Sequence, residues 1–342
     1  MDLTTRYLGL DLTSPVVASA GPATGDPVKA ERIVAAGAAA VVLPSLFEEE
    51  IVHEEFELHR ALEAGSGHFA EALDYFPAVD RFESVADRYL ALVERIRAGV
   101  AVPVVASLNA TTTGGWVRCA RLIEAAGADA LELNLYRVAA DPSRSAADME
   151  EADLALVADV SAAVTIPLAV KVSPYYTALA HFAGRLVDAG AGGIVLFNRF
   201  YQPDLDLDTL DVVPKVDLSQ PWELRLPLRW LAILHPLLAG RASLAATTGI
   251  HSGTDVAKAL LVGADVAMMT SALLRRGPEH VRTVIDDLQA WMEEHGYESV
   301  SQLRGSVSHA TTADPSAFER ANYRRTLHSW APPAQLSPAR PA

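Results

Sequence analysis

Short apolar runs alternate along this chain with longer segments of helical periodicity. The apolar runs lie near Val16–Ser19, Ala40–Leu43, Val104–Leu108, Ala130–Leu135, Leu168–Val172, Gly193–Phe197, Leu244–Thr247 and Val266–Thr270. The helical segments lie around residues 27–36, 81–98, 114–126, 148–163, 176–189, 222–239, 253–262 and 278–295. Several helices close on a glycine before the next strand, as in AAGADALEL at 125–133. Strands that are apolar on both faces and alternate with helices indicate a parallel sheet.

Eight such units predict a closed (β/α)8 barrel, and 342 residues is an ordinary length for one. The alternative is a doubly wound sheet, which is disfavoured because no GxGxxG follows the first strand. We expect the barrel to occupy residues 1–312. Residues 313–342 should add a helix near Pro315–Thr326 and a mobile Pro/Ala-rich tail.

Two connections are longer than a barrel requires. Leu46–Asp80 contains a charged helical stretch and then HFAEALDYFP, and its length is typical of a lid over a binding site. Arg199–Pro221 contains PDLDLDTLDVV, whose alternation predicts a small strand on top of the barrel.

Composition narrows the class of protein. The net charge of −15 argues against a nucleic-acid partner, since few positive charges are available to neutralise phosphates. No run of 18 apolar residues predicts a membrane span, and the first residues lack the pattern of a signal peptide. A single Cys119 excludes an intrachain disulfide and a thiolate metal cluster, and we expect no metal. We therefore expect a cytoplasmic protein that acts on a small molecule.

The last two strands carry a possible anion site. Leu244–Gly277 predicts strand, turn, helix, strand, turn and helix, with Gly249 in the first turn and Thr270 and Ser271 in the second. Backbone N–H groups of two adjacent turns can bind one phosphate, and this end of a (β/α)8 barrel often does so. The alternative is that these are ordinary turn residues without a ligand.

Polar residues also gather where the other strands end. Asn109, Asn134, Asn198 and Lys171 all fall at the carboxyl ends of apolar strands. They could satisfy one another, with Lys171 paired to Glu132, or they could bind a ligand. Together with an anion site they favour a ligand, because carboxamides can bind the edges of a flavin and a lysine can stabilise negative charge near its N1. FMN, which has one phosphate, suits one anion site.

Several segments resemble one known family. They are SPVVASAGP near the start, LELNL, LAVKVSPY, the asparagine that ends the sixth strand, and TTGIHSGTDVAKALLVGADVAMMTSALLRRGP. In this order they are similar to the dihydroorotate dehydrogenase family of FMN-binding barrels. The resemblance implies that Ala20 and Gly21 flank the flavin, that Asn109 and Asn134 contact ring or substrate, and that Lys171 lies at the flavin N1 edge. It also implies that Asn198 binds substrate and that Gly249, Ile250, Thr270 and Ser271 hold the phosphate.

The chain departs from the family at several positions. Where the family has a catalytic Cys or Ser, this chain has Arg137, and Pro44 stands where the family has a lysine. Because arginine cannot accept a proton, we expect Arg137 and the neighbouring Tyr136 to bind the substrate, with Arg137 holding an anionic group. Thr248 and Thr270 each replace a phosphate-turn glycine, and their hydroxyls could donate to the phosphate.

A relocated base could come from another side chain. The candidates are Tyr136, Tyr175, Tyr176, His53 and His251. Cys119 lies away from the strand ends, so we expect it to pack in the core.

The resemblance implies an FMN-dependent oxidoreductase that transfers hydride from dihydroorotate, or a similar heterocycle, to flavin N5 in pyrimidine biosynthesis. Two alternatives stay open: an FMN reductase of another substrate, and a non-catalytic flavoprotein. The electron acceptor is open, and the chain has no iron–sulfur motif of its own. The resemblance also implies a homodimer, for which Arg199–Pro221 is the expected contact segment.

Overall fold

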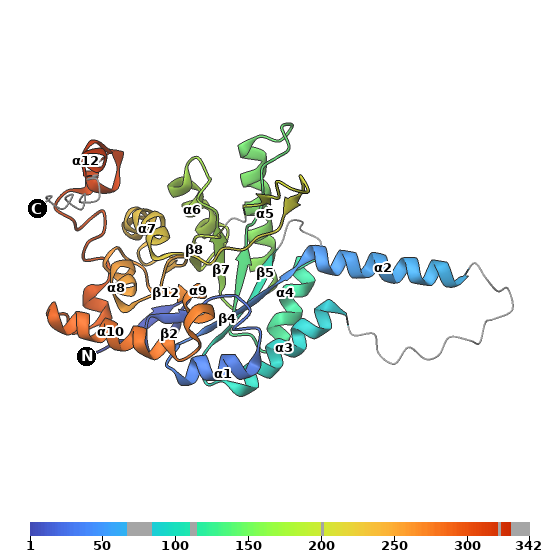
Figure 1. Ribbon diagram of the computed structural model, residues 1–342, viewed down its shortest axis with the longest axis horizontal. Helices are drawn as coiled ribbons and strands as arrows, with labels where there is room; N and C mark the ends of the chain where they lie inside the picture. Colours follow the sequence, from blue (N-terminus) through green and yellow to red (C-terminus); the bar gives the residue numbers. More distant parts are fainter. Residues whose placement is uncertain (67–83, 110–114, 200–201, 321–322, 330–342) are drawn as a thin grey trace, which may run out of the picture.

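The computed structural model describes residues 1–66, 84–109, 115–199, 202–320 and 323–329. Eight parallel strands form a closed barrel, and their order around it follows the chain (Figure 1). They are β3 (Val16–Ala18), β4 (Val41–Phe47), β5 (Val104–Asn109), β6 (Ala130–Asn134), β7 (Leu168–Val172), β8 (Gly193–Leu196), β11 (Ser243–Ala246) and β12 (Val266–Met269). The predicted (β/α)8 barrel is confirmed.

Helices cover the outside of this barrel. They are α1 (Pro27–Ala35), α3 (Val85–Gly99), α4 (Trp116–Ala125), α5 (Ala146–Ala163), α6 (Leu179–Asp188), α7 (Arg225–Leu238), α8 (Gly253–Leu261) and α10 (His280–Glu294). Two short helices precede two of them: η1 (Pro221–Leu224) before α7 and α9 (Ser271–Arg276) before α10. Helix α8 is capped at its start, because Ser252 and Asp255 form a reciprocal capping box.

Strand β4 is longer than the sequence predicts. The apolar run ends at Leu43, but pairing with β5 continues to Phe47 after an irregularity between Val42 and Ser45. Pro44 lies in this irregularity, as expected for a residue that cannot donate to the ladder. The extension places Ser45 beside Ser107 of β5, at the mouth of the barrel.

An antiparallel hairpin of β1 (Thr5–Tyr7) and β2 (Leu10–Leu12) closes the amino-terminal end of the barrel, and the sequence did not predict it. Tyr7, Leu8 and Leu12 pack against inward-facing residues of the barrel strands, many of them small. Leu8 lies so close to Gly193 of β8 that a Cβ there would be 2.7 Å from its Cδ2. The hairpin therefore supplies the volume that the alanines of the interior leave open.

The predicted additions are partly within the described residues. After β4, the charged stretch forms α2 (Glu48–Ser66), which extends away from the barrel (Figure 1). The predicted strand after β8 is a small hairpin of β9 (Asp204–Leu205) and β10 (Val212–Val213). Residues 68–77 of the proposed lid and the tail from 330 to 342 lie outside the described residues.

The end of the chain differs from the prediction of one helix near Pro315–Thr326. A short α11 (Val300–Leu303) follows the last barrel helix. The predicted helix is instead a 3-10 turn, η2 (Pro315–Phe318), and a separate short helix, α12 (Tyr323–His328). No helix in the described ranges has the length and apolar character needed to cross a bilayer.

Tyr7→Ala should lower the free energy of unfolding by about 3–5 kcal/mol, because it empties the bottom of the barrel of its largest side chain. Urea unfolding would measure this. Arg6→Ala is the matched control in the same hairpin, since the Arg6–Asp11 pair is exposed and 3.9 Å long and should contribute less than about 0.5 kcal/mol. Equal effects of the two substitutions would contradict the proposed role of the hairpin.

Candidate functional site

The two-residue period of the strands carries polar side chains into the mouth of the barrel. Along β6, Ala130 packs with the interior cluster, and Glu132 and Asn134 follow on the same side. Along β7, Ala169 lies in the same cluster and Lys171 follows. In the parallel register Asn134 pairs with Lys171. The polar layer thus lies directly above a dry layer of small apolar residues.

Within this layer the polar side chains bind one another. Lys171 Nζ lies 3.4 Å from Glu132 Oε1, and Glu132 is completely buried. Asn134 Nδ2 donates to the hydroxyls of Ser45 and Ser107, each at 2.8 Å. Within the described ranges, Asn134 Oδ1 and Glu132 Oε2 have no hydrogen-bond partner in the protein. The alternative, in which these side chains bind one another, therefore holds for Lys171. Asn134 has partners for its Nδ2 but, within the described ranges, none for its Oδ1.

A cavity of about 630 Å³ opens above this layer, and we call it the amide cavity because Asn109, Asn134 and Asn198 line it. Its other lining residues include Ala20, Gly21, Ser45, Tyr136, Lys171 and Arg199. Asn198 Nδ2 donates to the backbone oxygens of Lys171 at 3.0 Å and Leu135 at 3.4 Å. Its carboxamide is therefore oriented with the donor end held by the protein.

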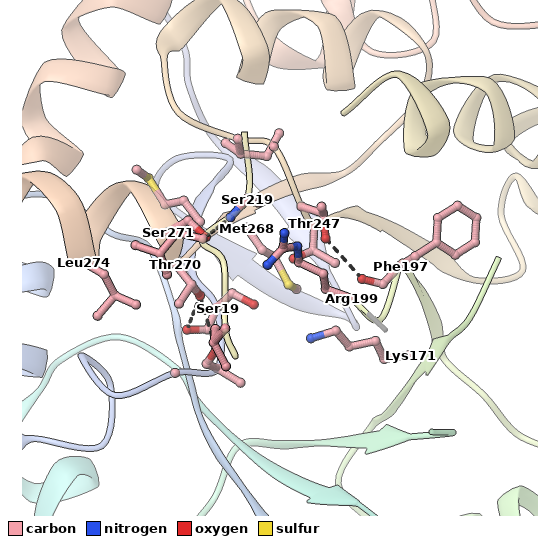
Figure 2. Close-up of a pocket in the computed structure, with 18 of the residues that line it drawn as sticks. Ser19, Lys171, Phe197, Arg199, Ser219, Thr247, Met268, Thr270, Ser271 and Leu274 are labelled. Atoms are coloured by element: carbon pink, nitrogen blue, oxygen red, sulfur yellow. Dashed lines mark hydrogen bonds between the residues drawn. The ribbon is translucent and has the colours of Figure 1, made fainter. Parts of the chain in front are cut away.

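A second cavity of about 290 Å³ lies beside the first, and we call it the turn cavity (Figure 2). The turns after β11 and β12 line it with Gly249, Ile250, Thr270 and Ser271. Ala20, Gly21, Pro22, Lys171 and Arg199 line both cavities. The two cavities therefore form one continuous site, of the size of small-molecule sites in general.

The turn after β11 has an unusual backbone. Thr248 and Gly249 both have positive φ angles, 73° and 82°. A Cβ at Gly249 would lie 2.5 Å from Leu224 N, so the position accepts only glycine. Within the described ranges, the N–H groups of Gly249 and Ile250 bind no protein acceptor. Donors of this kind at the edge of a cavity suit an anion.

The two threonines that replace glycines do not offer their hydroxyl hydrogens to the cavity. Thr270 Oγ1 donates to the backbone oxygens of Ser19 at 3.0 Å and Ala20 at 3.2 Å. Thr248 Oγ1 approaches Phe197 O at 3.4 Å. The expectation that these hydroxyls donate to a phosphate does not fit these contacts. Thr270 instead ties β12 to the end of β3, where Gly21 has no Cβ to collide with it.

Arg137 lies in neither cavity. Its guanidinium is 3.4 Å from Asp153 Oδ1 on α5, and the hydroxyl of Tyr176 donates to Asp153 Oδ2 at 3.0 Å. Burial raises the pKa of Asp153, and the adjacent Arg137 charge opposes that rise. The role of Arg137 in substrate binding remains a prediction, but its contacts favour a structural role that fastens the loop after β6 to α5.

Of the side chains proposed as a relocated base, Tyr136 lines the amide cavity. The others line neither cavity: Tyr175, Tyr176, His53 and His251. His53 is exposed on α2, and Tyr176 is engaged with Asp153, which together with burial raises the pKa of its hydroxyl. His251 is buried, and burial lowers its pKa, so its ring is neutral at pH 7. Cys119 packs against the core from α4, as expected.

The charged side chains that line the two cavities within the described ranges are cations. Lys171, Arg199 and Tyr136 are the ionisable residues that line them within the described ranges. Arg199, which directly follows Asn198, is a site residue that the sequence reasoning did not assign. Its position immediately after a strand-end asparagine was a usable signal, but a charge at the start of a long connection is usually solvent-exposed.

Arg137→Ala should lower the free energy of unfolding by about 2 kcal/mol, because Asp153 would be left buried without its cation. Urea unfolding at pH 7 would measure this. The double variant Arg137→Ala/Asp153→Asn is the matched control and should recover part of the loss, since it removes the uncompensated charge. Unchanged stability of Arg137→Ala, combined with weaker binding of an anionic ligand, would support the substrate-binding role instead.

Comparisons with known proteins identify the family of this chain. The family model for dihydroorotate dehydrogenase matches residues 79–292, more than half of the chain. The catalytic subunit of dihydroorotate dehydrogenase B (NAD(+)) from Methanothermobacter thermautotrophicus is 23% identical over 310 residues, covering 89% of this chain and 97% of that one.

Two further relatives are similar over shorter stretches. The corresponding subunit from Halalkalibacterium halodurans is 28% identical over 227 residues, covering 61% of this chain and 69% of that one. The chloroplastic dihydropyrimidine dehydrogenase (NADP(+)) of Arabidopsis thaliana is 24% identical over 214 residues, covering 58% of this chain and half of the plant protein. Since the family model covers most of the barrel, including β5 to β12, this chain belongs to the dihydroorotate dehydrogenase family.

Proposed function

We propose that this protein is an FMN-dependent oxidoreductase that acts on dihydroorotate or a similar small heterocycle. The observation that carries the proposal is the continuity of the two cavities across Lys171. On one side of this ammonium lie three carboxamides, and on the other lie two turns, the first of which has backbone donors without a protein acceptor within the described ranges. A flavin mononucleotide needs this combination of a cation, carboxamides and one anion site.

The donors and acceptors of the site suit a flavin. Asn134 Oδ1 is a buried acceptor without a protein partner within the described ranges, and an N–H group at a ring edge would satisfy it. Lys171 would offer its ammonium to the N1 edge, held in place by Glu132 below. The N–H groups of Gly249 and Ile250 would hold the phosphate, with Ser271 Oγ beside them. FMN, when bound, would supply the acceptor for hydride at N5.

The chain's own residues would then hold the substrate over the flavin. The carboxamide oxygen of Asn198 faces the site because its Nδ2 is bound to backbone oxygens, so it would accept from a substrate N–H. Asn109 lines the same cavity from β5. Tyr136 lies at the rim and would exclude water from one side of the substrate.

A second candidate is an FMN-dependent reductase of another substrate. The observation that favours it is that no carboxylate, histidine or cysteine of the described ranges lines either cavity. Oxidation of dihydroorotate requires a base to remove a proton from carbon. A phenolic hydroxyl can donate a proton, which Tyr136 would do during reduction.

The purified protein should contain FMN, visible as flavin absorption. Lys171→Met combined with Glu132→Gln, which avoids leaving a buried carboxylate without its cation, should keep most of the FMN. It should lower the reduction potential of the flavin and slow its anaerobic reduction by dihydroorotate by about 100-fold, because the reduced ring would lose its cation. Lys29→Met, on the surface of α1, is the control and should change the rate less than about twofold. A colourless protein that does not take up added FMN would refute the proposal.

We also propose a homodimer formed through the β9–β10 hairpin. This segment exposes a cluster of large apolar side chains: Leu205, Leu207, Leu210, Val212 and Val216. Leu207 and Leu210 are each 83% exposed, which is unusual for leucines so close together. Val216 also lines the turn cavity, so pairing of two copies would support the site.

Leu207→Ser combined with Leu210→Ser should shift the mass measured by light scattering from that of two chains to that of one, with dimer affinity reduced by about tenfold or more because the apolar contact is lost. Leu237→Ser, at a leucine that is 53% exposed on α7, is the control and should leave the mass unchanged. A parent protein that has the mass of one chain at all concentrations would contradict the homodimer.

A further inference from the structure

We propose that Arg199 is the residue that recognises an anionic substrate, so that the site selects a heterocycle with a carboxylate over its uncharged counterpart. This inference rests on the proposed function and adds a specificity-determining residue to it. Arg199 follows β8 and lines both the amide cavity and the turn cavity. Figure 2 shows its guanidinium reaching into the middle of the turn cavity, on the side where the Lys171 ammonium also points.

The guanidinium is anchored at one nitrogen and open at the others. Arg199 Nε donates to Glu223 Oε1 at 3.2 Å. Within the described ranges, Nη1 and Nη2 have no acceptor in the protein. The side chain is 40% exposed, and that of Glu223 is 19% exposed. Two donors of a planar fork are therefore available to a ligand, in the geometry that suits a carboxylate.

Glu223, which binds Arg199 Nε, is itself oriented by a second hydrogen bond. Glu223 lies in η1, and its Oε2 accepts from the backbone N–H of Gln220 at 2.6 Å, within a capping box. One carboxylate oxygen thus fixes the turn and the other fixes Arg199. Because the guanidinium is already oriented, less side-chain entropy is lost when it binds an anion.

No other charged group of the described ranges is as well placed for this task. Lys171 also lines both cavities, but its proposed place is at the flavin ring, and Arg137 is paired with Asp153 outside the cavities. No acidic side chain of the described ranges lines either cavity to compete for Arg199.

Two sources of anion fit this chemistry, a substrate carboxylate and the phosphate of the cofactor. The backbone donors of Gly249 and Ile250 already suit the phosphate. Arg199 also lines the amide cavity, where those turns do not reach. We assign Arg199 to the carboxylate because these backbone donors already provide for the phosphate, and measuring FMN content separates the two sources.

The test compares two probes that share a ring and differ in a carboxylate, orotate and uracil. Each is titrated into the FMN-loaded, full-length protein while the flavin absorption is followed. Arg199→Gln should weaken orotate binding by about 10- to 100-fold, since a charge-assisted pair is lost, and change uracil binding less than about twofold. Its FMN content should match that of the parent. Arg199→Lys should recover part of the orotate affinity because it keeps the charge without the fork.

Arg229→Gln, at an exposed arginine of α7, is the matched charge control and should change orotate affinity less than about twofold. Equal weakening of orotate and uracil, no weakening of either, or loss of FMN from Arg199→Gln would overturn the inference. A parent protein that takes up no FMN would instead refute the proposed function, and with it the basis of this inference.

Discussion

The structure depends on a buried ion pair placed above an apolar floor. Glu132 and Lys171 come from adjacent strands, and their contact lies inside the barrel, with Glu132 fully buried. Removing two charges from water is costly, so neither side chain would be retained here without the other. The pair fixes Lys171 close to the mouth, where it lines both cavities. The site can therefore hold a positive charge at a defined place without a loop to position it.

The floor below this pair comes from two distant parts of the chain. The strands contribute small side chains, and the amino-terminal hairpin fills the space between them with Tyr7, Leu8 and Leu12. This keeps water away from the lower side of Glu132 and strengthens its attraction to Lys171. The hairpin thus influences the electrostatics of a site at the opposite end of the barrel, although it touches no ligand.

The charges that line the site differ from those of the whole protein. The chain carries a net charge of −15, but the ionisable residues that line the cavities within the described ranges are two cations and a tyrosine. Each cation has a carboxylate partner behind it, Glu132 for Lys171 and Glu223 for Arg199. The donors of the two cations therefore face the cavities, and their glutamate partners lie outside the lining.

The sequence alone determined the barrel, the family and most residues of the site. The short apolar strands and the glycines that close helices are local signals, and both predicted the barrel correctly. The strand-end asparagines and Lys171 could be placed together because parallel strands end at one face of a barrel. Eleven of the predicted site residues line the two cavities, although their roles in binding remain predictions: Ala20, Gly21, Asn109, Asn134, Tyr136, Lys171, Asn198, Gly249, Ile250, Thr270 and Ser271.

The tertiary structure decided what depends on contacts between distant elements. Arg137 pairs with an aspartate on the following helix, and nothing in the local sequence marks that partner. Arg199 turns toward the cavities because Glu223, which follows the β9–β10 hairpin, holds its Nε. The hairpin at the start of the chain packs against the alanines of β6, β7 and β11, which lie more than a hundred residues away in the sequence. Periodicity fixes which side of a strand a residue faces, whereas the direction of a long, charged side chain is set by the partner that it meets after folding.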